Sequence, residues 1–286
     1  MTFRPRRLAA VLAFGAACTV LCVALSPGGI APATYDHRDL HAERPTALRD
    51  PGPAPAAQRP PAPTTLSYTS GGRSLKVWEA RPPGDGPHPV VVYLHGGAAL
   101  EDAEWQAAQA FVAAGYAVVA PTWRGESGNP GHYELCYGEL DDAIAAVRWA
   151  AQREGLDHTR MFAFGYQTGG VLSAFLSLHG ELPLLATASV SAMYTADALG
   201  ELGVPLPFVD DPTERELRTF PPFFGQPAGS HIAYVGGLDP LIAPLEDKLQ
   251  AAAERGQLRV NLLWLRADHR SALAPAIQAF TAQIGS

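Results

Sequence analysis

The chain has 286 residues, of which 47% are hydrophobic, so it is long enough to bury one large core. Its formal net charge of -7 argues against nucleic acid as a partner, because surfaces that bind nucleic acid are usually basic. The 28 glycines and 26 prolines exceed ordinary usage, and much of the proline excess lies in one early stretch.

The first segment predicts export. Basic residues within 4–7 precede an almost unbroken apolar run at 8–25, which Ser26 ends. This arrangement is typical of a signal peptide or signal anchor, and the run is just long enough to span a bilayer. The small residues at 31–33 offer a cleavage site, which favours secretion. Residues 1–33 are therefore predicted to direct an extracytoplasmic location, with any membrane contact confined to this segment.

The next segment, residues 34–63, predicts an extended, semi-rigid tether. It is rich in proline and alanine and shows no apolar periodicity. His37 and His41 lie at helical spacing, but no carboxylate or cysteine partners complete a ligand pattern, so we interpret them as solvated side chains. No metal site is expected. Beyond the leader, Cys136 is the only cysteine, which excludes an intrachain disulfide.

Residues 64–286 alternate between strand and helix patterns, which predicts one α/β domain. A hairpin is expected from strands at 65–68 and 75–80, and Val90 to Leu94 has the continuous apolar character of a strand buried on both faces. The later elements expected in chain order are a helix at 104–114, a strand at 116–120, a helix at 139–153, strands at 161–164, 184–191 and 231–235, a helix at 245–255, a strand at 259–265 and a helix at 275–284. This order indicates a mostly parallel central sheet with helices on both faces.

A Pro-rich insertion separates the sixth and seventh core strands. Residues 192–230 lack periodicity and include the aromatic stretch Phe220-Pro221-Pro222-Phe223-Phe224. A segment of this length inside a regular α/β alternation is usually a lid or a pocket wall. Its aromatic content favours packing against the domain over a loose surface excursion.

A tight turn after the strand at 161–164 carries the most specific motif. It reads Gly165-Tyr166-Gln167-Thr168-Gly169 and precedes an apolar helix. This spacing is typical of the nucleophile elbow, G-x-S-x-G, which holds a strained central residue at the top of a sheet. The central residue here is Gln167, and an amide cannot attack a carbonyl. The Thr168 hydroxyl is expected to point away from the site and Ser173 to be buried. The turn lacks a P-loop lysine and dinucleotide spacing, so no cofactor is expected.

Two further strand exits carry Asp239 and His269, so the chain order is Gln167, Asp239, His269. Catalytic groups gather at the carboxyl ends of strands in open α/β sheets. We therefore expect Asp239 and His269 to lie within hydrogen-bond reach of each other beside Gln167, the carboxylate orienting the imidazole as a general base.

A fourth strand exit, His95-Gly96-Gly97, matches a loop that supplies an oxyanion donor. The oxyanion hole is expected to use the backbone N–H groups of this Gly96-Gly97 loop and of Thr168. His95 itself is interpreted as structural, with no role in acid–base chemistry.

Three stretches carry a family resemblance: 90–97, 120–128 and 160–170. They resemble the catalytic domain of the prolyl oligopeptidase family of serine peptidases, and dienelactone hydrolases are similar over the same region. The resemblance covers about Ser74 to Ile284. It implies an α/β-hydrolase fold and hydrolysis of peptide or ester bonds by a serine, an aspartate and a histidine. Asp239 and His269 fall at the acid and base positions, whereas Gln167 occupies the nucleophile position.

The presence of Gln167 in place of the nucleophile serine leaves two alternative functions. The first is an exported binding or regulatory protein, inactive or severely impaired, that accepts an ester, acyl or peptide group. The second is an active hydrolase that uses another nucleophile or a water activated by His269; retention of Asp239 and His269 favours it. In the first, the Gln167 amide is expected to mimic an amide substrate: its oxygen accepts from Thr168 and the Gly96-Gly97 loop, and its NH₂ donates toward His269.

Overall fold

The structure is a computed structural model that describes residues 41, 46, 64–97, 99–194, 211–218, 220, 230–240, 251, 254–255 and 260–285. The predicted leader, most of the predicted tether and most of the helix predicted at 245–255 lie outside these residues. Within the described ranges, no helix has both the length and the apolar character needed to cross a membrane.

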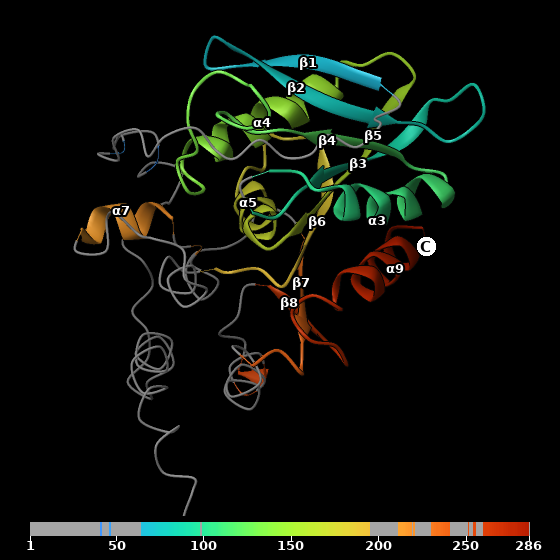
Figure 1. Ribbon diagram of the computed structural model, residues 1–286. Helices are drawn as coiled ribbons and strands as arrows, with labels where there is room; N and C mark the ends of the chain where they lie inside the picture. Colours follow the sequence, from blue (N-terminus) through green and yellow to red (C-terminus); the bar gives the residue numbers. More distant parts are fainter. Residues whose placement is uncertain are drawn as a thin grey trace, which may run out of the picture.

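One eight-stranded sheet forms the centre of the domain, and each strand corresponds to one predicted from the sequence (Figure 1). Its order is β1-β2-β4-β3-β5-β6-β7-β8. The pairs β1–β2 and β2–β4 are antiparallel and all other pairs are parallel, which confirms the predicted topology. The strands are β1 (Thr64–Ser70), β2 (Arg73–Ala80), β3 (His88–Leu94), β4 (Ala117–Pro121), β5 (Leu156–Tyr166), β6 (Leu184–Val190), β7 (Ser230–Gly236) and β8 (Asn261–Leu265).

Helices cover both faces of this sheet (Figure 1). Their bounds are α3 (Asp102–Ala113), α4 (Gly138–Ala150), α5 (Thr168–Leu176), α7 (Pro212–Leu217) and α9 (Leu273–Ile284). Strand β3 shows why a layer of helices is needed on each face of the sheet. Val90 and Val92 pack into the core under α4 and α5, whereas Val91 and Tyr93 pack into the core under α3 and α9. Successive strand side chains point to opposite faces, so an apolar strand is stable only when both faces are covered.

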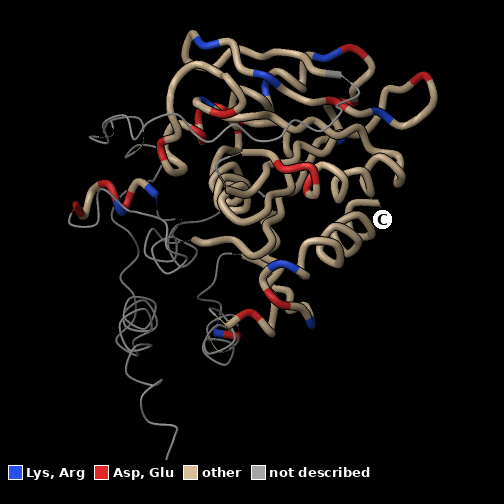
Figure 2. Tube along the Cα trace, in the orientation of Figure 1, with Lys and Arg blue, Asp and Glu red and all other residues tan. Residues whose placement is uncertain are grey.

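The turn between β5 and α5 brings α5 against the end of β3. A Cβ on Gly169 would overlap the backbone carbonyls of Leu94 and His95, and a Cβ on Gly165 would overlap the carbonyl of Gly169. Only glycine allows this close approach. Helix α5 carries no charged residue and is buried throughout, including Ser173 as expected (Figure 2). The turn is therefore fixed between buried elements.

Part of the insertion packs against the domain, as its aromatic content predicts. Phe220 is buried and its ring lies 5.6 Å from those of both Phe175 and Tyr194, and 6.0 Å from that of His231. The short helix α7 also belongs to the insertion. Asp211 caps its first turn by accepting bonds from two backbone N–H groups.

Several boundaries differ from the sequence prediction. Helix α9 begins at Leu273 instead of Pro275, because proline is tolerated in the first helical turn, where its missing N–H has no intrahelical partner. Strand β5 begins at Leu156 instead of Met161. Its exposed polar residues 158–160 resemble a loop in sequence, but the strand continues through them.

The prediction that His41 of the tether is solvated is wrong. Its Nε2 lies 3.2 Å from Oδ1 of Asp141, and its ring lies 4.4 Å from the ring of Tyr137. Its side chain is 12% exposed. The partners come from the loop before α4 and from α4 itself, so tertiary packing supplies the contacts that the tether sequence lacks.

The contact at Gly169 gives a stability prediction. Gly169→Ala places a methyl group against backbone that cannot rotate away, so we expect it to destabilise the fold by about 3 kcal/mol, the upper end of overpacking costs. Gly237→Ala is the matched control, because its Cβ would make only ordinary contacts, the nearest at 3.5 Å. Urea denaturation measures both. Equal midpoints for the two variants would contradict the proposed crowding.

Candidate active site

Three loops at one edge of the sheet bring the predicted site residues together. Gln167 follows β5, Asp239 follows β7 and His269 follows β8. These strands are parallel neighbours through β6, so their carboxyl ends meet at the same edge.

Asp239 and His269 form a hydrogen-bonded pair, as predicted. Oδ2 of Asp239 lies 2.7 Å from Nδ1 of His269. The Asp239 side chain is 2% exposed and the His269 side chain 18% exposed. A carboxylate accepts, so Nδ1 carries the hydrogen and Nε2 presents a lone pair toward the elbow. This is the orientation that a general base requires.

Gln167 engages that lone pair. Its Nε2 lies 3.2 Å from Nε2 of His269, and it also donates to the hydroxyl of Tyr166 at 3.1 Å. The predicted donation from the Gln167 amide toward His269 is therefore confirmed. The basic nitrogen of the imidazole contacts an amide where a serine hydroxyl lies in a complete triad.

The backbone of Gln167 is strained in the way the elbow motif predicts. Its φ is 50° and its ψ is -115°, which is unusual for a residue with a Cβ. Such a conformation costs about 1–3 kcal/mol and persists only where the surroundings fix it. Here the Gln167 N–H donates to Val190 O at 3.1 Å, and the Val171 N–H donates to Gln167 O at 3.2 Å.

Behind this site, the loop after β3 is held by two buried glutamates, the first of which is Glu126. Its Oε1 accepts from the Leu100 N–H at 2.8 Å, and its Oε2 accepts from the Trp123 N–H at 2.8 Å and faces His95 Nε2 at 3.0 Å. The other ring nitrogen of His95 faces the Gly96 carbonyl at 2.9 Å. A carbonyl only accepts, so Nδ1 donates to Gly96, and Nε2 pairs with Glu126, which assigns His95 to holding this loop.

The environment of His95 agrees with that assignment. Burial lowers the pKa of His95, but the charge of Glu126 and the hydrogen bond to it outweigh this effect, so the net shift is upward. The ring also stacks on Trp123, with 4.9 Å between centroids. His95 is thus structural, as the sequence indicated.

The second glutamate, Glu104, corrects part of the predicted oxyanion hole. Its Oε1 accepts from the Gly96 N–H at 2.8 Å. Gly96 therefore offers no free donor, either to an oxyanion or to the Gln167 oxygen. The Thr168 hydroxyl donates to the Gly97 carbonyl at 3.2 Å. Gly97 and Thr168 remain the predicted donors.

Three residues that shape the site are missing from the sequence prediction: Glu104, Glu126 and Ser191. Ser191 follows β6 and donates from its hydroxyl to the His269 carbonyl at 2.7 Å, which fixes the histidine loop. Glu104 lies three residues after Glu101 at a helix start, a spacing typical of a capping box, and this signal points to a structural carboxylate. Glu126 lies in a glycine-rich loop, and nothing in its local sequence indicates its contact with His95.

Comparison with known proteins agrees with this fold. The family model for X-Pro dipeptidyl-peptidase (S15 family) matches residues 71–202. The chain shares 27% identity over 115 residues with the uncharacterized peptidase YtmA of Bacillus subtilis, which is 40% of this chain and 45% of that protein. The aligned part thus spans less than half of that relative.

Solved structures show the same architecture. Esterase Est22 superposes with a TM-score of 0.59 at 16% identity, over 78% of each chain. A putative dienelactone hydrolase from Klebsiella pneumoniae superposes with a TM-score of 0.58 at 17% identity, over 78% of this chain and 98% of that one.

This chain has the α/β-hydrolase fold. Over part of its length its sequence is similar to peptidases, and its fold is similar to that of an esterase. The fold implied by the sequence resemblance is thereby confirmed.

The buried carboxyl beside the glycine loop gives a pH prediction. Burial raises the pKa of Glu104 from 4.5 to about 7. The unfolded chain therefore releases the proton of Glu104 at a lower pH than the folded chain does. The stability that this proton supplies is complete below pH 4.5 and is lost as the pH rises through 7. Over that range the loss should be about 2–3 kcal/mol.

Glu104→Gln should remove this dependence, because an amide does not titrate and its oxygen still accepts from Gly96. The free energy of unfolding of Glu104→Gln, measured by urea denaturation from pH 5 to pH 8, should increase relative to that of wild type as the pH rises. Parallel curves for the two proteins would contradict the prediction. Glu154→Gln, at an exposed position, is the control.

Proposed function

We propose that this protein is a binding or regulatory protein built on a serine-hydrolase scaffold, catalytically inactive or severely impaired. The observation that carries the proposal is the Gln167 carboxamide at the nucleophile position, 3.2 Å from Nε2 of His269. An amide is not a nucleophile, and this one engages the nitrogen that would accept the proton of a serine. Replacing a triad nucleophile lowers kcat by about 10⁶.

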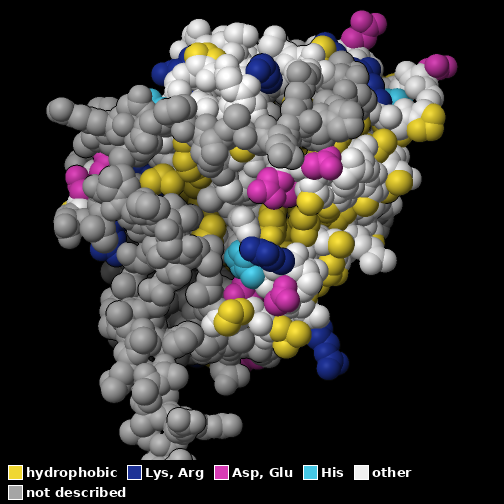
Figure 3. All heavy atoms as spheres, in the orientation of Figure 1, with side chains coloured by type: hydrophobic (Ala, Val, Ile, Leu, Met, Phe, Trp, Pro, Cys, Tyr) yellow, Lys and Arg dark blue, Asp and Glu magenta, His cyan; other side chains and the backbone are white. Residues whose placement is uncertain are grey.

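The ligand we propose is an uncharged ester, acyl or peptide group. The similarity to peptidases and esterases supports this class. The molecular surface adds a second argument. On the face drawn in Figure 3, a histidine and a basic side chain lie together between acidic groups, with hydrophobic atoms beside them. Charges of both signs lie among the described atoms of this face, which does not favour a polyanion as ligand.

A second function, hydrolysis by a water that His269 activates, is favoured by one specific observation. The Asp239–His269 pair keeps its 2.7 Å hydrogen bond and its buried carboxylate, although a binding protein needs neither. In this mechanism the Gln167 amide leaves Nε2 of His269, and a water takes its place. The water gives a proton to Nε2, and its oxygen forms a bond to the carbonyl carbon of the ligand. When the tetrahedral intermediate collapses, the bond from that carbon to the leaving oxygen or nitrogen breaks, and Nε2 returns the proton to the leaving group.

Gln167→Ser should complete a triad and restore esterase activity. We expect hydrolysis of p-nitrophenyl acetate at least about 10²-fold above wild type, which is a small part of what a triad nucleophile contributes. Labelling by a fluorophosphonate should appear with it. The double variant Gln167→Ser, His269→Ala should lose both, because the introduced serine then has no base.

Gln167→Ala is the matched control, since it uncovers His269 without supplying a nucleophile. No gain in Gln167→Ala supports the proposal. A gain equal to that of the serine variant would favour the water mechanism. A wild type as active as Gln167→Ser, or labelled by the fluorophosphonate, would overturn the assignment as an impaired enzyme.

We further propose that the protein acts outside the cytoplasm, on the basis of the basic and apolar residues at 4–25. Fractionation of producing cells should recover it from the extracytoplasmic pool. N-terminal sequencing should find a mature chain that begins near Thr34 if the leader is cleaved, or an intact membrane-associated chain if it is an anchor. Recovery of the intact chain from the cytosol would contradict the proposal.

A further inference from the structure

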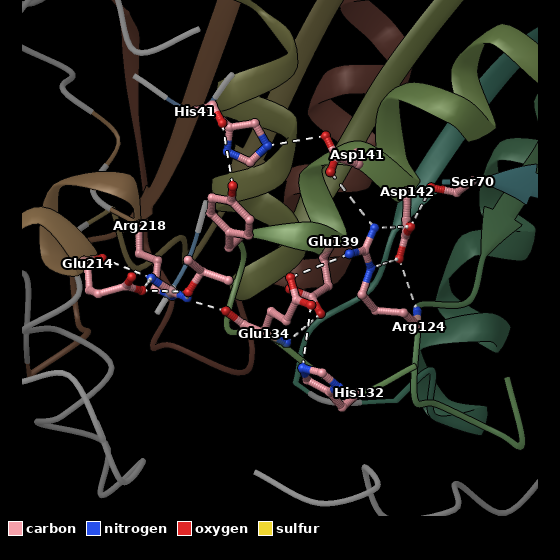
Figure 4. A network of polar contacts seen from close by, with 12 residues as sticks. His41, Ser70, Arg124, His132, Glu134, Glu139, Asp141, Asp142, Glu214 and Arg218 are labelled. Atoms are coloured by element: carbon pink, nitrogen blue, oxygen red, sulfur yellow. Dashed lines mark hydrogen bonds and ion pairs between the residues drawn. The ribbon is translucent and has the colours of Figure 1, made fainter. Parts of the chain in front are cut away.

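A network of polar contacts that does not include Gln167, Asp239 or His269 links three parts of the chain (Figure 4). Its centre is the loop before α4, which contains Glu134. Helix α4 lies on one side of this loop and α7 of the insertion on the other. The residues His41 and Thr46, from the predicted tether, complete the network.

On the side of the network toward α4, buried side chains form short ion pairs and hydrogen bonds. Arg124 bonds to both carboxylate oxygens of Asp142 at 2.7 and 3.0 Å, and to Glu134 at 3.4 Å. Glu139, from the first turn of α4, accepts from the Glu134 N–H at 2.7 Å. Arg124, Asp142 and Glu139 are buried. These contacts fix the loop independently of the tether.

The side toward α7 depends on Arg218. This residue is 1% exposed, and its Nε donates to the Glu134 carbonyl at 3.0 Å. Its Nη1 donates to Glu214 Oε2 at 2.6 Å. Its guanidinium lies 5.7 Å from the centroid of the Tyr137 ring. Arg218 therefore joins the end of α7 to the loop before α4.

Thr46 binds Glu214 of α7 and Arg218, the C-cap residue that follows the helix. Its hydroxyl donates to Glu214 Oε2 at 2.6 Å and accepts from Arg218 Nη2 at 3.0 Å. A single hydroxyl thus bridges a buried ion pair. Hydrogen bonds to charged groups are about twice as strong as neutral ones.

His41 provides a second attachment on the other side of the loop. It bonds to Asp141 of α4 at 3.2 Å, and its carbonyl lies 3.4 Å from the hydroxyl of Tyr137. His41 therefore contacts α4, and Thr46 contacts α7.

Helix α7 needs such support. It has six residues, far below the roughly 12–15 at which an isolated helix becomes even marginally stable in water. Of its residues, Glu214 and Leu217 are buried, and Glu214 is the one that Thr46 contacts.

We propose that His41 and Thr46 act together as a strap that fastens α7 to the domain. Loss of either contact then acts directly on α7. Two residues predicted from sequence to lie in a passive tether are, in this proposal, part of the folded unit.

Hydrogen exchange of the full chain tests the strap, with Thr46→Val and Thr46→Ser as a matched pair. Valine keeps the shape and removes the hydroxyl, whereas serine keeps the hydroxyl. We expect amides in 211–218 to exchange about tenfold faster in Thr46→Val, from the loss of two bonds to charged groups. Thr46→Ser should stay near wild type, and peptides from α4 and α5 should be unchanged in both.

A second pair makes the test independent of one position. His41→Ala should also accelerate exchange in 211–218. Arg148→Ala, on an exposed part of α4 outside the network, should not. Equal exchange of 211–218 in Thr46→Val and Thr46→Ser would overturn the proposal. Acceleration spread evenly over α4, α5 and α7 would also overturn it, because the residue would then support the whole fold.

Discussion

The close approach of α5 to the end of β3 is the constraint on which the rest of the site depends. Gly169 lets the helix backbone meet the carbonyls of Leu94 and His95, and Gly165 leaves room for the turn itself. With both ends fixed, Gln167 is held in a strained conformation and projects toward His269. The same contact places the Gly97 loop beside Thr168. One packing requirement therefore sets the positions of the elbow and of a loop distant in sequence.

Buried carboxyl groups hold the remaining pieces in place. Glu126 binds Leu100 and Glu104 binds Gly96 in the loop after β3, and Asp239 binds His269. Each carboxyl group replaces its lost hydration with N–H donors or an imidazole, which makes its burial tolerable. These interactions are directional, so they fix orientation more tightly than apolar packing does. They account for a site that keeps its geometry although its central residue carries no nucleophile.

In the proposed function, the arrangement around Gln167 keeps the frame of a hydrolase without its nucleophile. The acid and base keep the distances of a working pair, and the amide takes the place of the reacting group. The amide donates both to His269 and to Tyr166, so it is integrated into the site through two contacts. A binding role needs only the shape and polarity that this frame provides. Hydrolysis requires in addition that the amide move and admit water.

The sequence by itself determined the sheet, the elbow and the order Gln167, Asp239, His269. Strand and helix periodicities, and glycines at fixed spacing, are local signals that survive without tertiary information. The tertiary structure alone decided that Glu104 occupies the Gly96 N–H, that Glu126 pairs with His95, and that His41 and Thr46 bind the domain. Each of these contacts joins residues whose meeting depends on how whole elements pack. No local pattern encodes such a meeting, because the energy that drives it comes from burying both partners together.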